Sequence, residues 1–314
     1  MSYKIGIVGA ARRHQGTGPF IAKTFNQLGH KISGVIGTSQ ESTVETVKQL
    51  KSDFDIKTQA YTNLSDLLAQ RSVDILVISS PPETHLAYLQ EALNHGLHVF
   101  CEKPLWWPGH GSNLPLLEEY QANIQRCLSI AKEKHCLIHL NTQWPYTLRE
   151  CYKLYPELIS EEINQFVMHL SPQSEGKTML VDAASHGLSM LYQLVGPGNI
   201  LKIVVKQSDQ QNITINFDYQ HQNELTKTTF SFINSQAIPK PASYEINSHK
   251  VDRTVSLPEY QIKLQSNIRN MDIQDPLEAS IQDFLASIEA GLVTDEMALS
   301  QGAYHLYQLI KSYQ

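Results

Sequence analysis

Short apolar runs alternate with amphipathic segments along the first half of the chain. The apolar runs have the length of buried strands, and the segments between them repeat apolar residues at helical spacing. Strict alternation of this kind predicts a parallel sheet with helices on both faces. The strand-length runs are residues 3–8, 31–36, 58–61, 73–79, 97–101 and 136–141. The helical patterns are residues 19–28, 42–51, 64–70, 83–95 and 116–134.

The pattern changes in the second half. A strand is expected at 163–170 and a helix at 179–195, followed by segments in which polar and apolar residues alternate. Consecutive strands with this alternation form an antiparallel sheet with one covered face. The alternating segments are 201–208, 212–220, 224–233 and 244–257, and helical patterns at 277–291 and 296–313 end the chain. We therefore expect an α/β protein with two domains, residues 1–144 with a doubly wound parallel sheet and residues 145–314 with an α+β fold and a mainly antiparallel open sheet.

Charge and composition narrow the classes of function. The net charge of -6 and the pI of about 6.1 argue against a nucleic-acid partner. The longest apolar runs are too short to cross a membrane, and the residues after Met1 do not form a signal peptide, so we expect a cytoplasmic protein with no membrane partner. The four cysteines contain no C-x-x-C pair, so neither a disulfide framework nor a metal site is expected.

A glycine-rich segment separates the first predicted strand from the first helix. Dinucleotide sites use glycines at this place because the backbone must approach the pyrophosphate closely, and the following helix adds a partial positive charge. The loop is longer than the common G-x-G-x-x-G pattern, so a flexible connection is the alternative. The candidate cofactor-binding residues here are Gly9, Ala10, Arg12, Arg13, Gly16 and Gly18.

The end of the second predicted strand bears on the choice of cofactor. Dinucleotide sites that prefer NAD usually place Asp or Glu there to accept from the ribose 2′-hydroxyl. Here the strand is followed by Thr38 and Ser39, which can donate to a 2′-phosphate. Arg12 or Arg13 could pair with that phosphate, or they could form a solvated loop tip. We therefore predict NADP in preference to NAD.

Two later motifs make a resemblance specific. The fourth long strand runs into Ser79-Ser80-Pro81 with His85 downstream, and the fifth ends in Glu102-Lys103-Pro104. In this context the chain resembles the Gfo/Idh/MocA family of oxidoreductases, the relatives of glucose–fructose oxidoreductase and inositol dehydrogenase. The resemblance extends from Gly6 to the final helices.

The resemblance implies a function and roles for these residues. Family members bind NAD(P) and oxidise or reduce sugars, polyols, imines and related small molecules. Lys103 would face both nicotinamide and substrate, where its ammonium could donate to an oxygen that changes charge. Glu102 would orient Lys103 or contact the cofactor ribose; a solvated Glu–Lys pair is the alternative. Ser79, Ser80, Pro81 and His85 would belong to the cofactor site.

Asp182 and His186 open the predicted helix of the second half. They are four residues apart and share one helix face. The family has an Asp-x-x-x-His at its active site, which implies that His186 is the general acid or base and that Asp182 binds substrate or tunes the proton relay, with Lys103 completing the site. The alternative is an Asp near a helix start and an unrelated His.

Three tryptophans are candidates for substrate binding. Trp106 and Trp107 follow the Glu-Lys-Pro motif, and either Gln143 or Trp144 occupies the place where relatives often carry Arg. Indole rings can stack on the C–H faces of sugars, but they also bury large areas, so packing is an equal alternative. Ser189 stands where relatives often have a second Asp, so the identity of the substrate does not follow from the resemblance.

Together these patterns predict an NAD(P)-dependent dehydrogenase or reductase acting on a CH–OH or carbonyl group of a small molecule. One alternative is an enzyme that retains its cofactor and uses transient oxidation for elimination or glycoside cleavage. Another is a ligand-sensing protein without catalysis. The open face of the second sheet, by resemblance to the family, implies a homodimer or homotetramer.

Overall fold

The computed structural model describes residues 2–11, 17–109 and 113–313. It divides the chain into two compact units, which are described one at a time. The first unit comprises Met1–Pro108, Ala122–Asn141 and Ser280–Glu296, and the second comprises Gly109–Gln121, Thr142–Ala279 and Met297–Gln314. The division therefore differs from a single break after residue 144, because Ser280–Glu296 returns to the first unit and Gly109–Gln121 belongs to the second.

The first unit is built on a six-stranded parallel sheet in the order β3-β2-β1-β4-β5-β6. The order reverses between β1 and β4, and such a reversal is where open α/β sheets bind ligands. All residues of β4 are buried, which explains the continuous apolar run seen in the sequence. The strands are β1 (Lys4–Val8), β2 (Lys31–Ile36), β3 (Ala60–Tyr61), β4 (Ile75–Ile78), β5 (His98–Glu102) and β6 (Ile138–Asn141).

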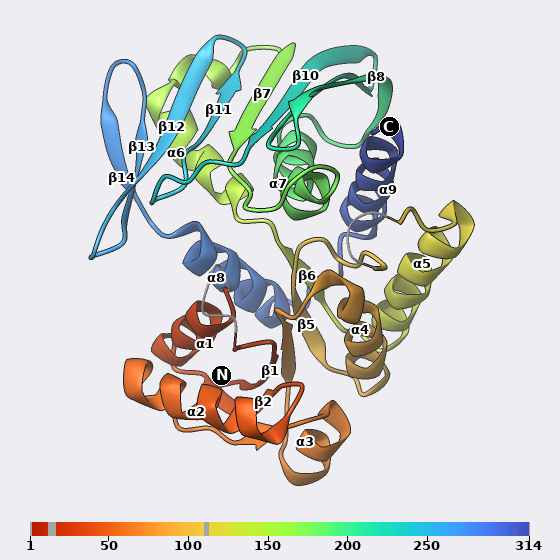
Figure 1. Cartoon of the computed structure of the whole chain (residues 1–314), viewed down its shortest axis with the longest axis vertical. Coiled ribbons are helices and arrows are strands. Elements are labelled where there is room, and N and C mark those ends of the chain that lie inside the picture. Colours follow the sequence, from red (N-terminus) through yellow and green to blue (C-terminus); the bar gives the residue numbers. More distant parts are fainter. Residues whose placement is uncertain (1, 12–16, 110–112, 314) are drawn as a thin grey trace. The chain divides into compact units, whose positions relative to one another are not determined.

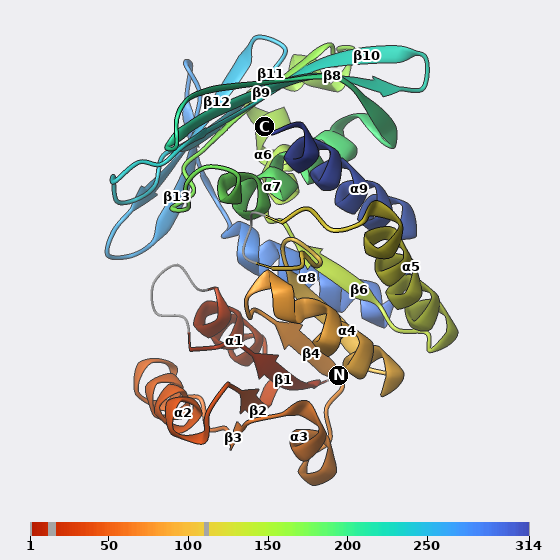
Figure 2. The ribbon, with the colours of Figure 1, turned by 45° about the vertical axis from the view of Figure 1, so that its right-hand side comes forward.

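Helices cover both faces of this sheet, with α1 and α2 on one face and α3 and α4 on the other (Figures 1 and 2). Phe25 of α1 and Phe284 of α8 both pack on Phe100 of β5, with ring centroids 6.0 and 5.5 Å apart. This contact explains why most of α8, from Ser280 onward, belongs to the first unit. The helices are α1 (Gly18–Gln27), α2 (Gln40–Phe54), α3 (Leu64–Gln70), α4 (His85–Asn94), α5 (Leu117–Glu133) and α8 (Pro276–Glu289), with a 3₁₀ turn, η1, at Pro82–Thr84.

The second unit contains an eight-stranded sheet in the order β14-β13-β12-β11-β7-β10-β9-β8. All neighbours are antiparallel except β7 and β10, so the predicted combination of a doubly wound parallel sheet with a mainly antiparallel one is confirmed. The strands are β7 (Gln165–Leu170), β8 (Gly198–Asp209), β9 (Asn212–His221), β10 (Glu224–Ile233), β11 (Ala242–Ile246), β12 (His249–Ser256), β13 (Gln261–Gln265) and β14 (Asn270–Ile273).

Helices of the second unit pack on one face of its sheet. A Cβ atom added to Gly187 of α7 (Thr178–Val195) would lie 2.5 Å from the ring of Phe230, so the helix approaches the sheet closely. His305 of α9 (Glu296–Ser312) packs edge-on against Tyr219, 5.7 Å away. The remaining elements are α6 (Leu148–Leu154) and two 3₁₀ turns, η2 (Trp144–Thr147) and η3 (Pro156–Ile159). Among the described residues no helix combines the length and apolar character needed to cross a membrane.

The structure corrects the strand pattern after residue 240. The segment 244–257, expected as one strand, forms β11 and β12 with a turn at Asn247, whose φ is 53°. Strands β13 and β14 were missed because they are short and mostly polar, and only Ile262 and Leu264 of β13 are buried.

Candidate functional site

The turn between β1 and α1 packs against the end of β4. Gly9 has a φ of +83°, and a Cβ atom there would lie 2.5 Å from the backbone nitrogen of Ser80. A Cβ atom on Gly18 would lie 2.7 Å from the Ser79 hydroxyl oxygen. Both positions therefore require glycine, and between them Ala10 is buried. The candidates Arg12, Arg13 and Gly16 lie outside the described residues.

Two serines follow β4 and form hydrogen bonds with neighbouring elements. The Ser79 hydroxyl donates to the carbonyl of Val8 at 2.8 Å, and the hydroxyls of Ser80 and Thr84 lie 2.6 Å apart. Both serines are buried, and Pro81 follows them at the start of η1. These three candidates thus lie at the carboxyl edge of the sheet, beside its topological switch point.

The amino end of α1 fits a bound pyrophosphate. Thr17 precedes the helix, but its side chain does not cap the helix, and no acidic residue occupies the first turn. Instead the Thr17 hydroxyl donates to Glu102 at 2.7 Å. Thr17 therefore leaves the backbone N–H groups of the first turn without its side chain as a cap, and an anion is favoured at such a helix end.

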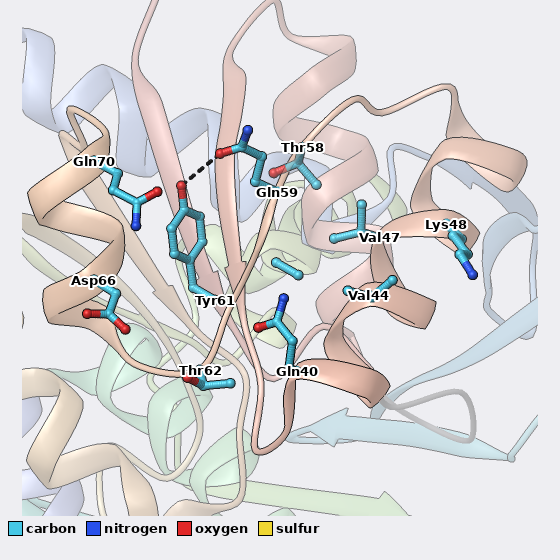
Figure 3. A pocket seen from close by; sticks show the side chains of 11 residues that line it. Gln40, Val44, Val47, Lys48, Thr58, Gln59, Tyr61, Thr62, Asp66 and Gln70 are labelled. Atoms are coloured by element: carbon cyan, nitrogen blue, oxygen red, sulfur yellow. Dashed lines mark hydrogen bonds between the residues drawn. The ribbon is translucent and has the colours of Figure 1, made fainter.

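Thr38 and Ser39 lie exposed after β2. The Ser39 hydroxyl accepts from the backbone N–H of Ser42 at 3.2 Å and so caps α2. Beside it opens a groove of about 490 Å³ along the sheet edge, which begins at Gln40 and is lined from α2, β3 and α3 (Figure 3). Inside this groove the Tyr61 hydroxyl donates to Gln59 at 2.9 Å.

His85 lies behind the cofactor-binding turns. Its side chain is fully buried, with Nε2 2.8 Å from the carbonyl of Ser80 and Nδ1 2.9 Å from that of Pro104. Burial lowers its pKa, and the carbonyls of Ser80 and Pro104 act in the opposite direction. The ring therefore connects the turn after β4 to the Glu-Lys-Pro turn and positions both, whereas the resemblance had placed it within the cofactor site.

Glu102 ends β5 and Lys103 follows it, and Glu102 accepts two side-chain hydrogen bonds at Oε1. Asn141 donates to it at 2.6 Å and Thr17 at 2.7 Å. Burial raises the pKa of Glu102, although Lys103 and both donors act in the opposite direction. The pattern-based search missed Thr17 and Asn141. Asn141 is the register partner of Glu102 in β6, so a correct strand alignment could have found it.

The tryptophans after the Glu-Lys-Pro motif are buried in the first unit. Trp107 is 0% exposed, and its backbone N–H donates to the carbonyl of Pro82 at 3.4 Å. Trp106 is 7% exposed. The packing interpretation therefore accounts for Trp107, and stacking of a sugar on its ring is not supported.

Asp182 and His186 lie on one half-buried face of α7, as their spacing predicted. His186 Nδ1 lies 2.5 Å from the carbonyl oxygen of Thr142, so Nδ1 carries the hydrogen and Nε2 is the nitrogen that can accept a proton. The same carbonyl accepts from the backbone N–H of Trp144 at 2.7 Å. Thr142, which the pattern-based search missed, thus links His186 to Trp144.

Trp144 is buried in the second unit rather than open to solvent. Its ring meets that of Tyr244 edge-on at 6.0 Å, and the guanidinium of Arg253 lies over it, 5.4 Å from the ring centroid. Arg253 had no pattern in the sequence that would single it out.

Comparison with known proteins finds a family match over the first part of the chain. Residues 3–142 match the model of the Gfo/Idh/MocA family, described as an oxidoreductase family with an NAD-binding Rossmann fold. An uncharacterised oxidoreductase of Schizosaccharomyces pombe is 42% identical over 60 residues, which cover 19% of this chain and 16% of that protein. The inositol 2-dehydrogenase/D-chiro-inositol 3-dehydrogenase of Shouchella clausii is 26% identical over 131 residues, covering 41% and 36%. The matches thus span well under half of either relative.

A solved structure extends the likeness over the whole fold. The scyllo-inositol dehydrogenase of Lactobacillus casei, solved with NAD(H) and scyllo-inositol, has a TM-score of 0.73 and 14% sequence identity, covering 100% of this chain and 97% of that one. At this identity the likeness concerns the fold. The match to the Gfo/Idh/MocA family of oxidoreductases, with its NAD-binding Rossmann fold, is thus confined to residues 3–142.

Proposed function

We propose that the protein is an NAD(P)-dependent dehydrogenase or reductase that interconverts a hydroxyl and a carbonyl, or an amine and an imine, on a sugar, polyol or related small molecule. The observation that carries this proposal is the pair Glu102–Lys103 at the carboxyl end of β5, in a sheet whose glycine turn and α1 amino end suit a pyrophosphate. The inositol dehydrogenases among the relatives support the class of substrate.

The chain's own residues would hold the cofactor at the carboxyl edge of the first sheet. The backbone at Gly9 and Gly18 would meet the pyrophosphate, and Glu102 would accept from a ribose hydroxyl. When bound, the nicotinamide would take up or supply the hydride. Asn141 and Thr17 position the Glu102 carboxylate for this role by donating to its Oε1.

Proton transfer is assigned to the second unit. His186 would accept the proton of a substrate hydroxyl at Nε2, because Nδ1 is held by the Thr142 carbonyl. Asp182, on the same face of α7, would orient the substrate or the imidazole. The Lys103 ammonium would donate to a substrate oxygen that gains negative charge, the kind of stabilisation that lowers a barrier most.

We further propose NADP in preference to NAD. Supporting this preference, neither Thr38 nor Ser39 supplies the carboxylate that would accept from a 2′-hydroxyl and repel a 2′-phosphate. The positive end of α2, capped by Ser39, also favours an anion, although Glu41 in its first turn opposes one.

The test begins with titration of the protein by NADPH and NADH, followed by a panel of sugars, polyols and imines monitored at the nicotinamide absorbance. Lys103→Ala and His186→Ala should each abolish turnover while the cofactor still binds. Lys57→Ala and His95→Ala, which remove exposed residues of the same types, are the matched controls. Full activity in both Lys103→Ala and His186→Ala would refute the mechanism.

An oligomer formed through the outer face of the second sheet is a further part of the proposal. This face alternates with the buried one, so Asn212, Thr214, Asn216 and Asp218 of β9 point outward and are only partly exposed. Light scattering of the wild type and of Thr229→Arg tests it, because a large cation on β10 should split a dimer or tetramer that uses this face, and an unchanged mass would exclude that interface.

A further inference from the structure

A guanidinium in the second unit forms no ion pair with a carboxylate of the described residues. Arg253 belongs to β12, where its side chain lies over the ring of Trp144 at 5.4 Å. Its one hydrogen bond within the described residues is long, 3.4 Å from Nη2 to the carbonyl of Lys240. Arg253 Nε is sealed from solvent and meets no acceptor there. Cationic groups in protein interiors are normally paired, so this arrangement calls for an explanation.

The acidic groups near Arg253 do not provide the missing partner. Asp275 and Tyr260 lie close enough to act on Arg253 electrostatically, but neither forms an ion pair or hydrogen bond with it. One oxygen of Asp275 instead accepts from the backbone N–H of Leu277 at 2.9 Å. Burial lowers the pKa of Arg253, which reflects the energetic cost of keeping this charge partly desolvated.

The terminal nitrogens of Arg253 remain available for a ligand. Nη1 makes no hydrogen bond with the described residues, and it is not among their sealed polar atoms. The planar face of the guanidinium is covered by Trp144. An edge of the group is therefore the part that could meet an incoming molecule.

The proposed proton-transfer residue belongs to the same network. The carbonyl of Thr142 lies 2.5 Å from His186 Nδ1 and accepts from the Trp144 N–H at 2.7 Å. The Arg253 guanidinium in turn lies over the indole ring of Trp144. All four residues lie in the second unit, so one contiguous set of contacts connects the imidazole to the cation.

We propose that Arg253 recognises a carboxylate on the substrate, which makes the substrate a sugar acid or another polyhydroxy acid. This inference rests on the proposed dehydrogenase function. A guanidinium edge offers two parallel N–H donors that match the two oxygens of a carboxylate. The attraction between the two charged groups is strongest where water is partly excluded. A single positive charge balances a carboxylate, whereas a phosphate dianion would require further cations.

The test compares matched acid and neutral substrates. The kcat/KM of the holoenzyme is measured with D-glucuronate against D-glucose and with D-gluconate against D-glucitol, each with NADPH or NADP present as the reaction requires. The acid should be preferred by about tenfold to 100-fold, the range expected for a hydrogen-bonded charge pair. In Arg253→Gln this ratio should fall to about one, through KM rather than kcat, and Arg253→Lys should restore part of it.

Two measurements separate recognition from a structural role. Lys250→Gln removes an exposed cation of the same strand, which pairs with Asp252 at 2.8 Å, and should leave the acid-to-neutral ratio unchanged. Calorimetric titration with D-gluconate should show binding to the wild type and its loss in Arg253→Gln, even if no substrate of the panel turns over. If Arg253→Gln fails to fold, the wild type is compared with Arg253→Lys instead.

The outcomes distinguish this inference from the proposed function. Turnover of the neutral compounds with no acid preference, and no change of ratio in the folded Arg253 variant, would overturn the inference and leave the dehydrogenase proposal standing. Absence of turnover with every compound would contradict the proposed function, and the D-gluconate titration would then decide the inference by itself. A preference for D-glucose 6-phosphate over both acids would refute the carboxylate assignment.

Discussion

The requirement for glycine at the β1–α1 turn can be divided into two physical parts. Gly9→Ala would introduce a side chain at a φ of +83° and place its Cβ 2.5 Å from the Ser80 nitrogen. The strained backbone should cost about 1–2 kcal/mol, and the clash in a packed turn about 1–3 kcal/mol. We therefore expect Gly9→Ala to lower the free energy of unfolding of the first unit by about 2–5 kcal/mol, a large part of the stability of a typical domain.

Two further glycines isolate each part. Gly29 has a φ of +86° with no atom near an added Cβ, so Gly29→Ala should show the backbone strain alone. Gly18 has no positive φ, but an added Cβ would lie 2.7 Å from the Ser79 hydroxyl oxygen and 2.9 Å from Ala10 Cα. Gly18→Ala should therefore show the clash alone, and the two losses should sum roughly to that of Gly9→Ala.

Hydrogen exchange of the β1 and β4 amides measures these losses, because protected core amides report the opening free energy of their own unit. NADPH titration of each variant gives the functional consequence, and binding should weaken in Gly9→Ala and Gly18→Ala but not in Gly29→Ala. A Gly9→Ala protein no less stable than Gly29→Ala would refute the reasoning, since the turn could then move away from β4 without loss.

Three further predictions concern the cofactor, pH and packing. Ser39→Asp adds the carboxylate missing after β2, so the ratio of NADPH to NADH affinity should fall by about tenfold or more, and an unchanged ratio would show that this position does not meet the ribose. Burial lowers the pKa of His139 to about 4, against about 6.5 in an unfolded chain, so the unfolded state binds more protons between these values and stability should fall as the pH decreases through them. His139→Phe should flatten this dependence in urea titrations, and an unaltered slope would contradict the burial of a neutral ring. Trp107→Phe should destabilise the protein by about 1–3 kcal/mol with little change in KM, because the indole is fully buried; a large rise in KM at normal stability would revive the substrate-stacking role.

The candidate site shows where pattern reasoning succeeds and where it stops. The pattern placed Gly9 and Glu102–Lys103 at strand ends and Gly18 at the start of a helix, and the ends of parallel strands meet at one edge of the sheet. Asp182 and His186 were paired correctly because four residues make about one helical turn. Thr17, Asn141 and Thr142 escaped because each acts on a residue distant in the sequence, through a contact that no local spacing records.

Interactions local in the sequence determine most helices and strands of this protein, without reference to any tertiary contact. Apolar periodicity predicted the alternating strands and helices of the first sheet, because burial acts on each segment with the repeat of its own backbone. Tertiary structure alone assigned most of α8 to the first unit through Phe284, divided 244–257 into two strands, and set the cation of Arg253 over Trp144. These outcomes depend on which surfaces meet when distant segments pack together, and a one-dimensional pattern contains no record of the partner.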